Sequence, residues 1–131
     1  MPSTLTFTDE APNGTKLSSF TLESLAERMT AREIIRARIY QEVQDFNLNQ
    51  REQFRGLVQP TEAEQTFNGS KLKRHRPIDW EKQFAEALRA FDSNGFFMLV
   101  GERQAESLDE LFEVKVDTEI TFVKLVPLVG G

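Results

Sequence analysis

The chain has 131 residues, of which 39% are hydrophobic and 28% are charged, a composition that fits one soluble domain of ordinary size. The lack of cysteine excludes a disulfide scaffold, a thiolate metal site and a cysteine nucleophile, and a single histidine argues against a catalytic triad or a multi-histidine zinc site. A net charge of −5 disfavours nucleic-acid binding, no segment approaches the ~18 apolar residues of a membrane span, and the N-terminus lacks the features of a signal peptide. We therefore expect a cytoplasmic protein that is not an enzyme and that has no membrane or nucleic-acid partner.

The first expected element is a β-hairpin. Apolar residues alternate with threonines over residues 3–8, which is typical of a half-buried strand. Residues 12–14, Pro-Asn-Gly, supply a turn because Asn and Gly tolerate a positive φ. A second strand is expected over residues 15–22. The spacing from Leu17 to Phe20 breaks strict alternation, which predicts a bulge or a slip in this strand.

The clearest helix start in the sequence lies at Thr30. The hydroxyl of Thr30 and the carboxylate of Glu33 fit a capping box, in which each side chain binds a free N–H at the helix start. Apolar residues then follow at helical spacing, namely Ile34, Ile35, Ile39, Val43 and Phe46. We expect a helix over residues 31–46 with this stripe buried.

A segment of different composition covers residues 47–95. It is polar and rich in turn residues as far as Pro77, and it contains a basic patch made of Lys71, Lys73, Arg74 and Arg76. Such a run is either a solvated loop or a contact for an acidic surface on a partner protein. No aromatic residues are interleaved for base stacking, so the patch does not indicate nucleic acid.

The remaining expected elements are a second helix and two strands. Asp79 has the position of an N-cap and Asn94-Gly95 that of a stop signal, with a stripe between them made of Trp80, Phe84, Leu88 and Phe91. The apolar run over residues 96–100 is typical of a central strand covered on both faces. A polar connection follows, whose many carboxylates we expect to be solvated. Residues 120–126 then give the strongest strand pattern in the chain.

The last two residues, Gly130 and Gly131, are the ones that suggest a chemistry. Such a pair also occurs as a frayed terminus or as an expression scar. Here, however, the strand over residues 120–126 leads directly into it, and Pro127 limits further pairing at the strand exit. Because glycine has no Cβ, the tail can extend through a narrow channel to an ATP site, and the Gly131 carboxylate is an unhindered acyl group. Attack of this carboxylate on the α-phosphorus of ATP would give an acyl-adenylate that an amine, a thiol or sulfide can attack.

These elements together resemble the β-grasp superfamily. The resemblance rests on a hairpin, a helix that opens with residues 30–35, strands at residues 96–100 and 117–122, and the terminal Gly130-Gly131. It is to ubiquitin-like modifiers and to the sulfur carriers of molybdopterin and thiamine biosynthesis. The tail over residues 127–131 is more similar to the Pro-Pro-Val-x-Gly-Gly ending of the molybdopterin carriers than to the basic ending of ubiquitin. The segment over residues 47–95 departs from the family as an insertion.

The resemblance implies an α+β fold in which a mixed β-grasp sheet packs on a helix. One domain would cover residues 1–131, with an inserted loop and helix at about 47–95 and a diglycine tail at 127–131. The resemblance also implies that a ubiquitin-activating-type enzyme, which uses its own ATP and Mg, adenylates Gly131, so that no cofactor is bound by this chain.

Three functions remain open at this point. As a modifier, the chain would pass through a conjugating enzyme to lysines of target proteins, and a deconjugating peptidase would release it. As a sulfur carrier, it would bear a thiocarboxylate at Gly131 for cofactor biosynthesis. As a β-grasp interaction module, it would make no use of its diglycine. The insertion favours the modifier, whereas the tail sequence favours the carrier.

A partner-binding surface is expected on the last strand. If Ile120 and Phe122 point inward, the period of two sends Val123 and Leu125 outward. Ubiquitin-like folds use an apolar patch beside the tail for recognition, so the resemblance implies partner-binding residues at Val123, Leu125, Pro127, Leu128 and Val129. The alternative is that the second helix covers this face, which would make Val123 and Leu125 core residues.

Overall fold

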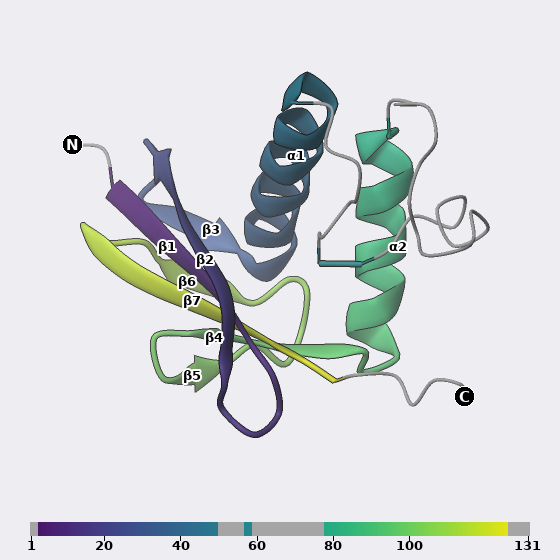
Figure 1. Cartoon of the computed structure of the whole chain (residues 1–131). Helices are drawn as coiled ribbons and strands as arrows, with labels where there is room; N and C mark the ends of the chain where they lie inside the picture. Colours follow the sequence, from purple (N-terminus) through teal and green to yellow (C-terminus); the bar gives the residue numbers. More distant parts are fainter. Residues whose placement is uncertain (1–2, 50–56, 59–77, 126–131) are drawn as a thin grey trace. The chain divides into compact units, whose positions relative to one another are not determined.

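The computed structural model describes residues 3–49, 57–58 and 78–125 (Figure 1). The fold is α+β. The strands are β1 (Ser3–Glu10), β2 (Lys16–Ser24), β3 (Arg28–Thr30), β4 (Phe96–Val100), β5 (Arg103–Gln104), β6 (Leu111–Glu113) and β7 (Asp117–Lys124). The helices are α1 (Ala31–Asn49) and α2 (Trp80–Asp92). The chain forms two compact units, one made of the residues up to Ile34 and those from Ala90 onward, the other of Ile35–Arg89.

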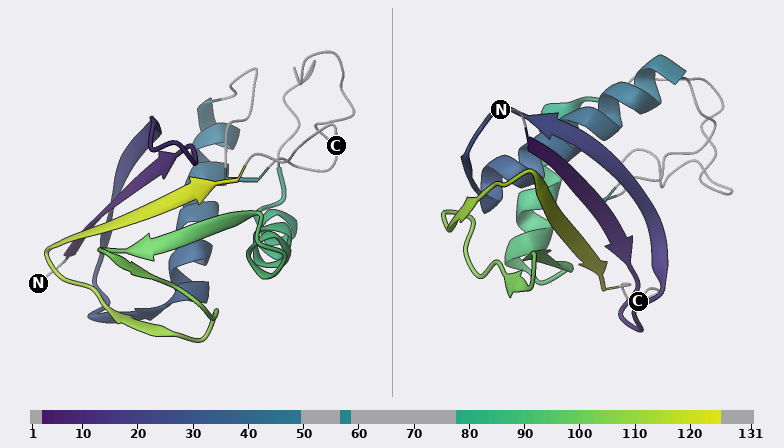
Figure 2. Two further views of the ribbon diagram at one scale, coloured as in Figure 1. Left: turned by 90° about the horizontal axis from the view of Figure 1, so that it is seen from below. Right: turned by 90° about the vertical axis from the view of Figure 1, so that its left-hand side faces the viewer.

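A mixed five-stranded sheet is the centre of the first unit. Its strand order is β2-β1-β7-β4-β5, and β3 and β6 form a separate two-stranded sheet. The last strand, β7, lies in the middle, parallel to β1 on one side and antiparallel to β4 on the other. Figure 2 shows β1 and β7 running in the same direction and β4 running against them. The α+β class and the mixed sheet are therefore as the sequence predicts.

One face of this sheet carries the core of the first unit. Buried and half-buried residues alternate along β1, so that Leu5 and Phe7 are fully buried, and the same alternation buries Ile120 and Phe122 on β7. The Phe7 and Phe122 rings stack at 6.0 Å between centroids, and Phe96 of β4 lies 5.7 Å from Phe122. Burial of such aromatic rings is worth several kcal/mol each relative to small side chains, so this row of rings fixes the register of the three central strands.

The hairpin between β1 and β2 forms as the turn residues predict. Gly14 has a φ of +90°, and the Thr15 N–H donates to the Asn13 side-chain oxygen at 3.0 Å. The register shifts between Asp9 and Glu10, because Asp9 pairs with Ser18 whereas Glu10 pairs with Lys16. Leu17 is the extra residue of this bulge and is 55% exposed. The predicted irregularity is confirmed, and Leu17 is a surface residue rather than part of the core.

The capping box at the start of α1 is confirmed. The Thr30 N–H donates to the Glu33 carboxylate at 2.8 Å, and the Glu33 N–H donates to the Thr30 hydroxyl at 3.1 Å. The helix continues to Asn49, beyond the predicted end at residue 46. Asn47 accounts for part of the extension, because its amide group binds both the N–H and the carbonyl of Ile78 at 2.9 and 3.1 Å.

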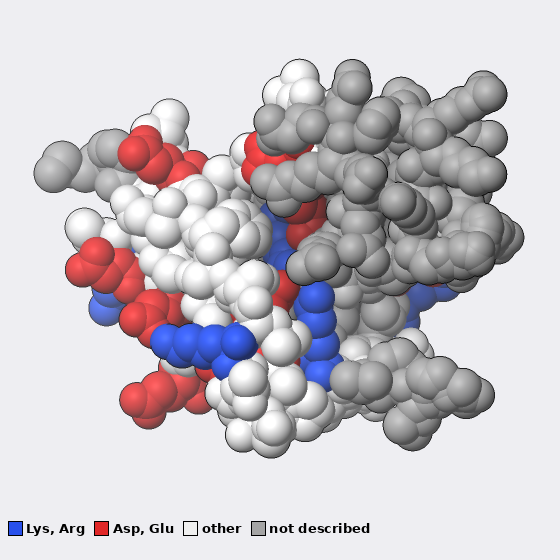
Figure 3. Space-filling model, viewed as in Figure 1, with Lys and Arg blue, Asp and Glu red and all other residues white. Residues whose placement is uncertain are grey.

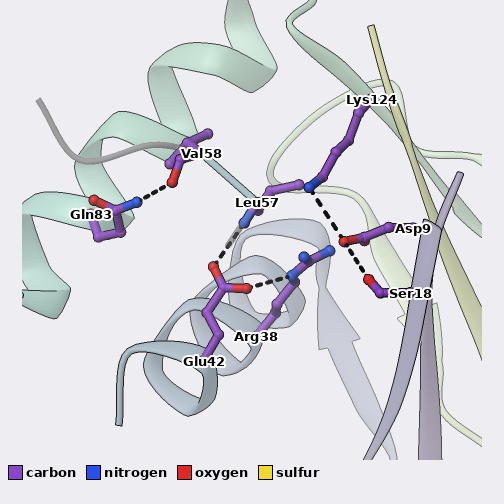
Figure 4. A network of polar contacts seen from close by, with 8 residues as sticks. All are labelled: Asp9, Ser18, Arg38, Glu42, Leu57, Val58, Gln83 and Lys124. Carbon is purple, nitrogen blue, oxygen red and sulfur yellow. Dashed lines mark hydrogen bonds and ion pairs between the residues drawn. The ribbon is translucent and has the colours of Figure 1, made fainter. Parts of the chain in front are cut away.

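The second unit holds the main part of both helices, and its buried centre is partly polar. Arg38 is fully buried and pairs with Glu42 at 3.1 Å, and the other Glu42 oxygen accepts the Leu57 N–H at 3.0 Å (Figure 4). On α2 the buried residues are Gln83 and Ala87, and the Gln83 amide donates to the Val58 carbonyl. Buried polar groups of this kind persist only when hydrogen-bonded, which is the case here.

This finding corrects the expected apolar stripe of the second helix. Asp79 does cap α2, since its carboxylate accepts the Glu81 N–H at 3.0 Å, but the stripe residues Trp80 and Phe84 are only half-buried. Trp80 instead makes an edge contact with Tyr40 at 5.2 Å between ring centroids, and the Arg36 guanidinium lies 4.9 Å from the Trp80 ring. The indole is therefore partly exposed and contacts the Tyr40 ring and the Arg36 guanidinium.

The end of α2 is a left-handed turn at Asn94, as the stop signal predicts. Asn94 has a φ of +61°, its N–H donates to the Phe91 carbonyl at 3.2 Å, and the Gly95 N–H donates to the Ala90 carbonyl at 2.7 Å. These two bonds form a Schellman motif, which satisfies carbonyls that the last helical turn leaves free. The chain then enters β4 directly at Phe96.

The polar connection and the last strand differ from the sequence expectation. The short strands β3, β5 and β6 were not predicted, because two or three residues give no recognisable periodicity. Strand β7 begins at Asp117 rather than at residue 120, since its polar start already pairs with Thr4 of β1. The strand ends at Lys124, and Leu125 follows it.

Candidate functional site

The candidate site is an apolar area on the face of the sheet opposite the aromatic core. Val123 of β7 lies on this face, because it alternates with the buried Phe122, and its partner on β4 is Phe97. Leu99 of β4 lies on the same face, opposite Thr121. We call the half-exposed side chains Phe97, Leu99, Val123 and Leu125 the β4–β7 patch.

The structure places Val123 and Leu125 where the sequence predicts and adds two residues beside them. Phe97 and Leu99 were missed because the apolar run over residues 96–100 was interpreted as a strand covered on both faces. The observed burial alternates along β4, and Phe97 and Leu99 are the half-buried positions. The expected inward direction of Ile120 and Phe122 is confirmed, since both are fully buried. The role of Val123 and Leu125 in partner binding stays a prediction.

The exit of the chain from β7 is anchored beside the start of β4. The Leu125 N–H donates to the Gly95 carbonyl at 3.2 Å, one residue beyond the Phe96–Lys124 pair that ends the ladder. The tail residues predicted to function, Pro127, Leu128, Val129, Gly130 and Gly131, lie outside the described residues. The structure therefore fixes where the chain leaves the sheet, at Leu125.

A buried carboxylate lies at this end of the sheet, on the core side. Asp9 is 2% exposed, its carboxylate lies 3.5 Å from the Lys124 ammonium, and it accepts a hydrogen bond from the Ser18 hydroxyl at 3.2 Å (Figure 4). The three residues come from β1, β7 and β2, so the Asp9 carboxylate links these three strands. The alternation that buries Leu5 and Phe7 also places Asp9 inward, and this signal in the sequence could have identified it.

The carboxylates of the segment before β7 are mostly solvated, as expected, with Glu110 as the exception. Glu110 is half-buried, accepts the Glu106 N–H at 2.9 Å, and is bound by Arg103 through Nε at 2.9 Å and Nη2 at 2.5 Å. The hydrogen bond from the Glu106 backbone and the Arg103 guanidinium hold the pKa of Glu110 below its ordinary value. Asp109 is exposed and pairs with Arg32 at 2.5 Å.

The other predicted site is the basic patch. Lys71, Lys73, Arg74 and Arg76 all lie outside the described residues, so the patch stays a prediction. Figure 3 shows acidic and basic side chains interspersed over the strands, rather than separated into large areas of one sign on the face that it draws.

Residues 3–49, 57–58 and 78–125 contain no group of three or more His, Cys, Asp or Glu side chains that could hold a metal ion. Of the helices in this part, none is both long and apolar enough to cross a membrane. The half-exposed side chains of the β4–β7 patch offer an apolar contact area to a partner.

Comparison with known proteins gives no relative for this chain. No family model, no curated protein and no solved structure matches it.

Proposed function

We propose that this chain is a β-grasp protein modifier that is activated at the carboxylate of Gly131. The observation that carries the proposal is the position of β7 in the sheet. β7 lies parallel to β1 in the middle of the sheet, next to β4, and it leads to the sequence Pro127–Gly131. A β-grasp fold likewise has a first hairpin, a helix, and a last strand between the first strand and an antiparallel neighbour. The strand order β2-β1-β7-β4-β5 supports this assignment.

The anchored end of β7 supports the use of the tail as an acyl donor. The Asp9–Lys124 ion pair and the Leu125–Gly95 hydrogen bond hold the chain at the point where it leaves the sheet. An activating enzyme that binds the β4–β7 patch would therefore find the tail starting at a fixed place. Holding one end of a binding segment in place reduces the entropy lost on binding.

The proposed chemistry takes place at the Gly131 carboxylate. One carboxylate oxygen attacks the α-phosphorus of ATP, pyrophosphate leaves, and the product is an acyl-adenylate on Gly131. A thiol of the activating enzyme then attacks the acyl carbon and AMP leaves. A lysine amine of the target finally displaces the thiol and forms an isopeptide bond. The side chains of this protein contribute recognition only.

A sulfur carrier is the alternative, and the tail sequence over residues 127–131 favours it. In that case sulfide equivalents attack the acyl-adenylate, AMP leaves, and Gly131 becomes a thiocarboxylate. A β-grasp module that uses neither reaction is the remaining alternative.

Trapping the acyl-adenylate tests the proposal. The full chain is incubated with ATP, Mg and a candidate activating enzyme, hydroxylamine is added, and the intact mass is measured. We expect a hydroxamate on the wild-type chain and none on a variant that lacks Gly131. Glu119→Gln, which changes an exposed residue of β7, is the control and should react as the wild type does. If the wild type and the variant without Gly131 behave alike with an enzyme that consumes ATP in response to the chain, the proposal is wrong.

A further inference from the structure

A surface cavity of about 280 Å³ lies where the end of α2, the start of β4 and the end of β5 meet. Its aromatic lining consists of Phe91, Phe96 and Phe97. Phe96 is buried and holds Phe91 in an edge contact at 6.0 Å between ring centroids, whereas Phe91 and Phe97 are half-buried. All lining residues belong to the first unit, so the cavity is formed by one body.

Apart from Ala105, the rest of the lining is polar, and its two charged residues are both acidic. Its polar residues are Asp92, Asn94, Gln104 and Glu106. All four are exposed, and within the described residues neither carboxylate has an ion-pair partner. The Glu106 backbone N–H donates a hydrogen bond to the Glu110 carboxylate. The cavity is therefore lined by two acidic residues and two amide residues beside the aromatic ones.

We propose that this cavity binds a cationic side chain of a partner protein, with arginine as the best fit. Two carboxylates attract a cation, and the half-buried rings of Phe91 and Phe97 offer a cation–π attraction, which is stronger for a desolvated cation. A guanidinium carries five N–H donors in a plane, which suits carboxylate and amide oxygens at the rim, and its methylene stem suits the rings. The described residues hold no cluster of three or more metal-ligating side chains, and the aromatic walls favour an organic cation over a metal ion.

The position of the cavity relates it to the β4–β7 patch. Phe97 belongs to both, and Gln104 pairs with Leu99 of the patch. A partner that covers the patch with apolar side chains would therefore bring a basic residue at its margin into the cavity. The inference does not depend on the proposed chemistry of Gly131, because no lining residue lies in the tail.

Titration of the ¹⁵N-labelled full chain with Nα-acetyl-arginine amide tests the inference. We expect saturable shifts of the backbone amides that line the cavity, in particular those of Phe97 and Gln104. The double variant Asp92→Asn, Glu106→Gln should bind about tenfold more weakly, since it loses two partly exposed charge contacts. Nα-acetyl-citrulline amide has a similar shape without the charge. It should bind the wild type about as weakly as the arginine probe binds the double variant.

A matched double variant separates the cavity from the net charge of the protein. Glu113→Gln with Glu119→Gln removes the same charge from exposed positions outside the cavity and should bind the probe as the wild type does. All four positions are exposed, so both variants should retain the wild-type spectrum elsewhere. The inference is wrong if the cavity amides do not shift saturably, or if both double variants weaken binding equally. Formation of the hydroxamate at Gly131 is measured separately and does not enter this test.

Discussion

The carboxylate of Asp9 and the ammonium of Lys124 lie 3.5 Å apart and join the end of β1 to the end of β7. Asp9 is 2% exposed, so its charge has little access to water, and Lys124 and the Ser18 hydroxyl are among the groups that stabilise it. The pair lies near the end of β1 and at the last residue of β7. Its integrity should determine how firmly the start of the tail is held.

Lys124→Met should lower the free energy of unfolding by about 2 kcal/mol, because it removes a cation that lies beside a buried carboxylate. Urea unfolding at neutral pH measures the change. Lys115→Met, at an exposed position before β7, is the control and should change the stability by less than about 0.5 kcal/mol. Equal effects of the two substitutions would show that the Asp9–Lys124 pair does not stabilise the sheet.

Asn94→Ala should destabilise the protein by about 1 kcal/mol, because Ala is strained at the φ of +61° that ends α2. Asn94→Gly should be neutral or slightly stabilising, since glycine adopts this conformation without a steric cost. Thermal or urea unfolding of both variants measures the difference between them. A Gly variant less stable than the Ala variant would contradict the assignment of a left-handed cap at Asn94.

Thr30→Ala should lower the free energy of unfolding by the ~1 kcal/mol that a helix cap supplies, and Glu33→Ala should lower it by a fraction of that amount. Glu33→Gln is the matched control and should retain most of the stability, because an amide oxygen can also accept the Thr30 N–H. Unfolding curves of the three variants rank them. The capping box is not important for stability if Glu33→Gln and Glu33→Ala are equally destabilised.

As the pH is lowered into the acid range, the free energy of unfolding should decrease partly because of Glu110. Its pKa is lowered in the folded chain by the Glu106 N–H and by Arg103, so its contribution is present above the pKa of the unfolded chain. The contribution is lost as the pH falls through the lower pKa of the folded state. Glu110→Gln should therefore reduce the loss of stability in the acid range, measured by urea unfolding at a series of pH values. A slope unchanged from that of the wild type would show that Glu110 does not contribute.

The double substitution Val123→Ser, Leu125→Ser should weaken binding of a cognate activating enzyme about tenfold, because both side chains belong to the β4–β7 patch. Titration calorimetry with the full chain measures the affinity. Thr6→Ser, on the same face of the sheet but on β1, is the control and should leave the affinity unchanged. Unchanged affinity of the double variant, with its fold intact, would exclude the patch as the contact surface.

Periodicity and turn chemistry in the sequence predicted the hairpin, both helices and β4. They failed where pairing rather than periodicity forms a strand, as in β6, which consists of three residues paired with β3. At the candidate site, alternation along β7 predicted the outward direction of Val123. Phe97 could not be assigned, because an unbroken apolar run gives no sign of which face is less covered. Asp9 was missed because a carboxylate in a strand is ordinarily assumed to be solvated.

Analysis of conjugates by mass spectrometry tests the central claim most directly. Lys124 is the last site of tryptic cleavage in the sequence, so a conjugated chain should leave residues 125–131, Leu-Val-Pro-Leu-Val-Gly-Gly, on the lysine of its target. We predict that peptides with this branch are recovered from cells that express the full chain and are lost when Gly131 is deleted. Recovery of residues 125–131 only as a free acid or as a thiocarboxylate, with no branched lysine, would contradict a role as a modifier.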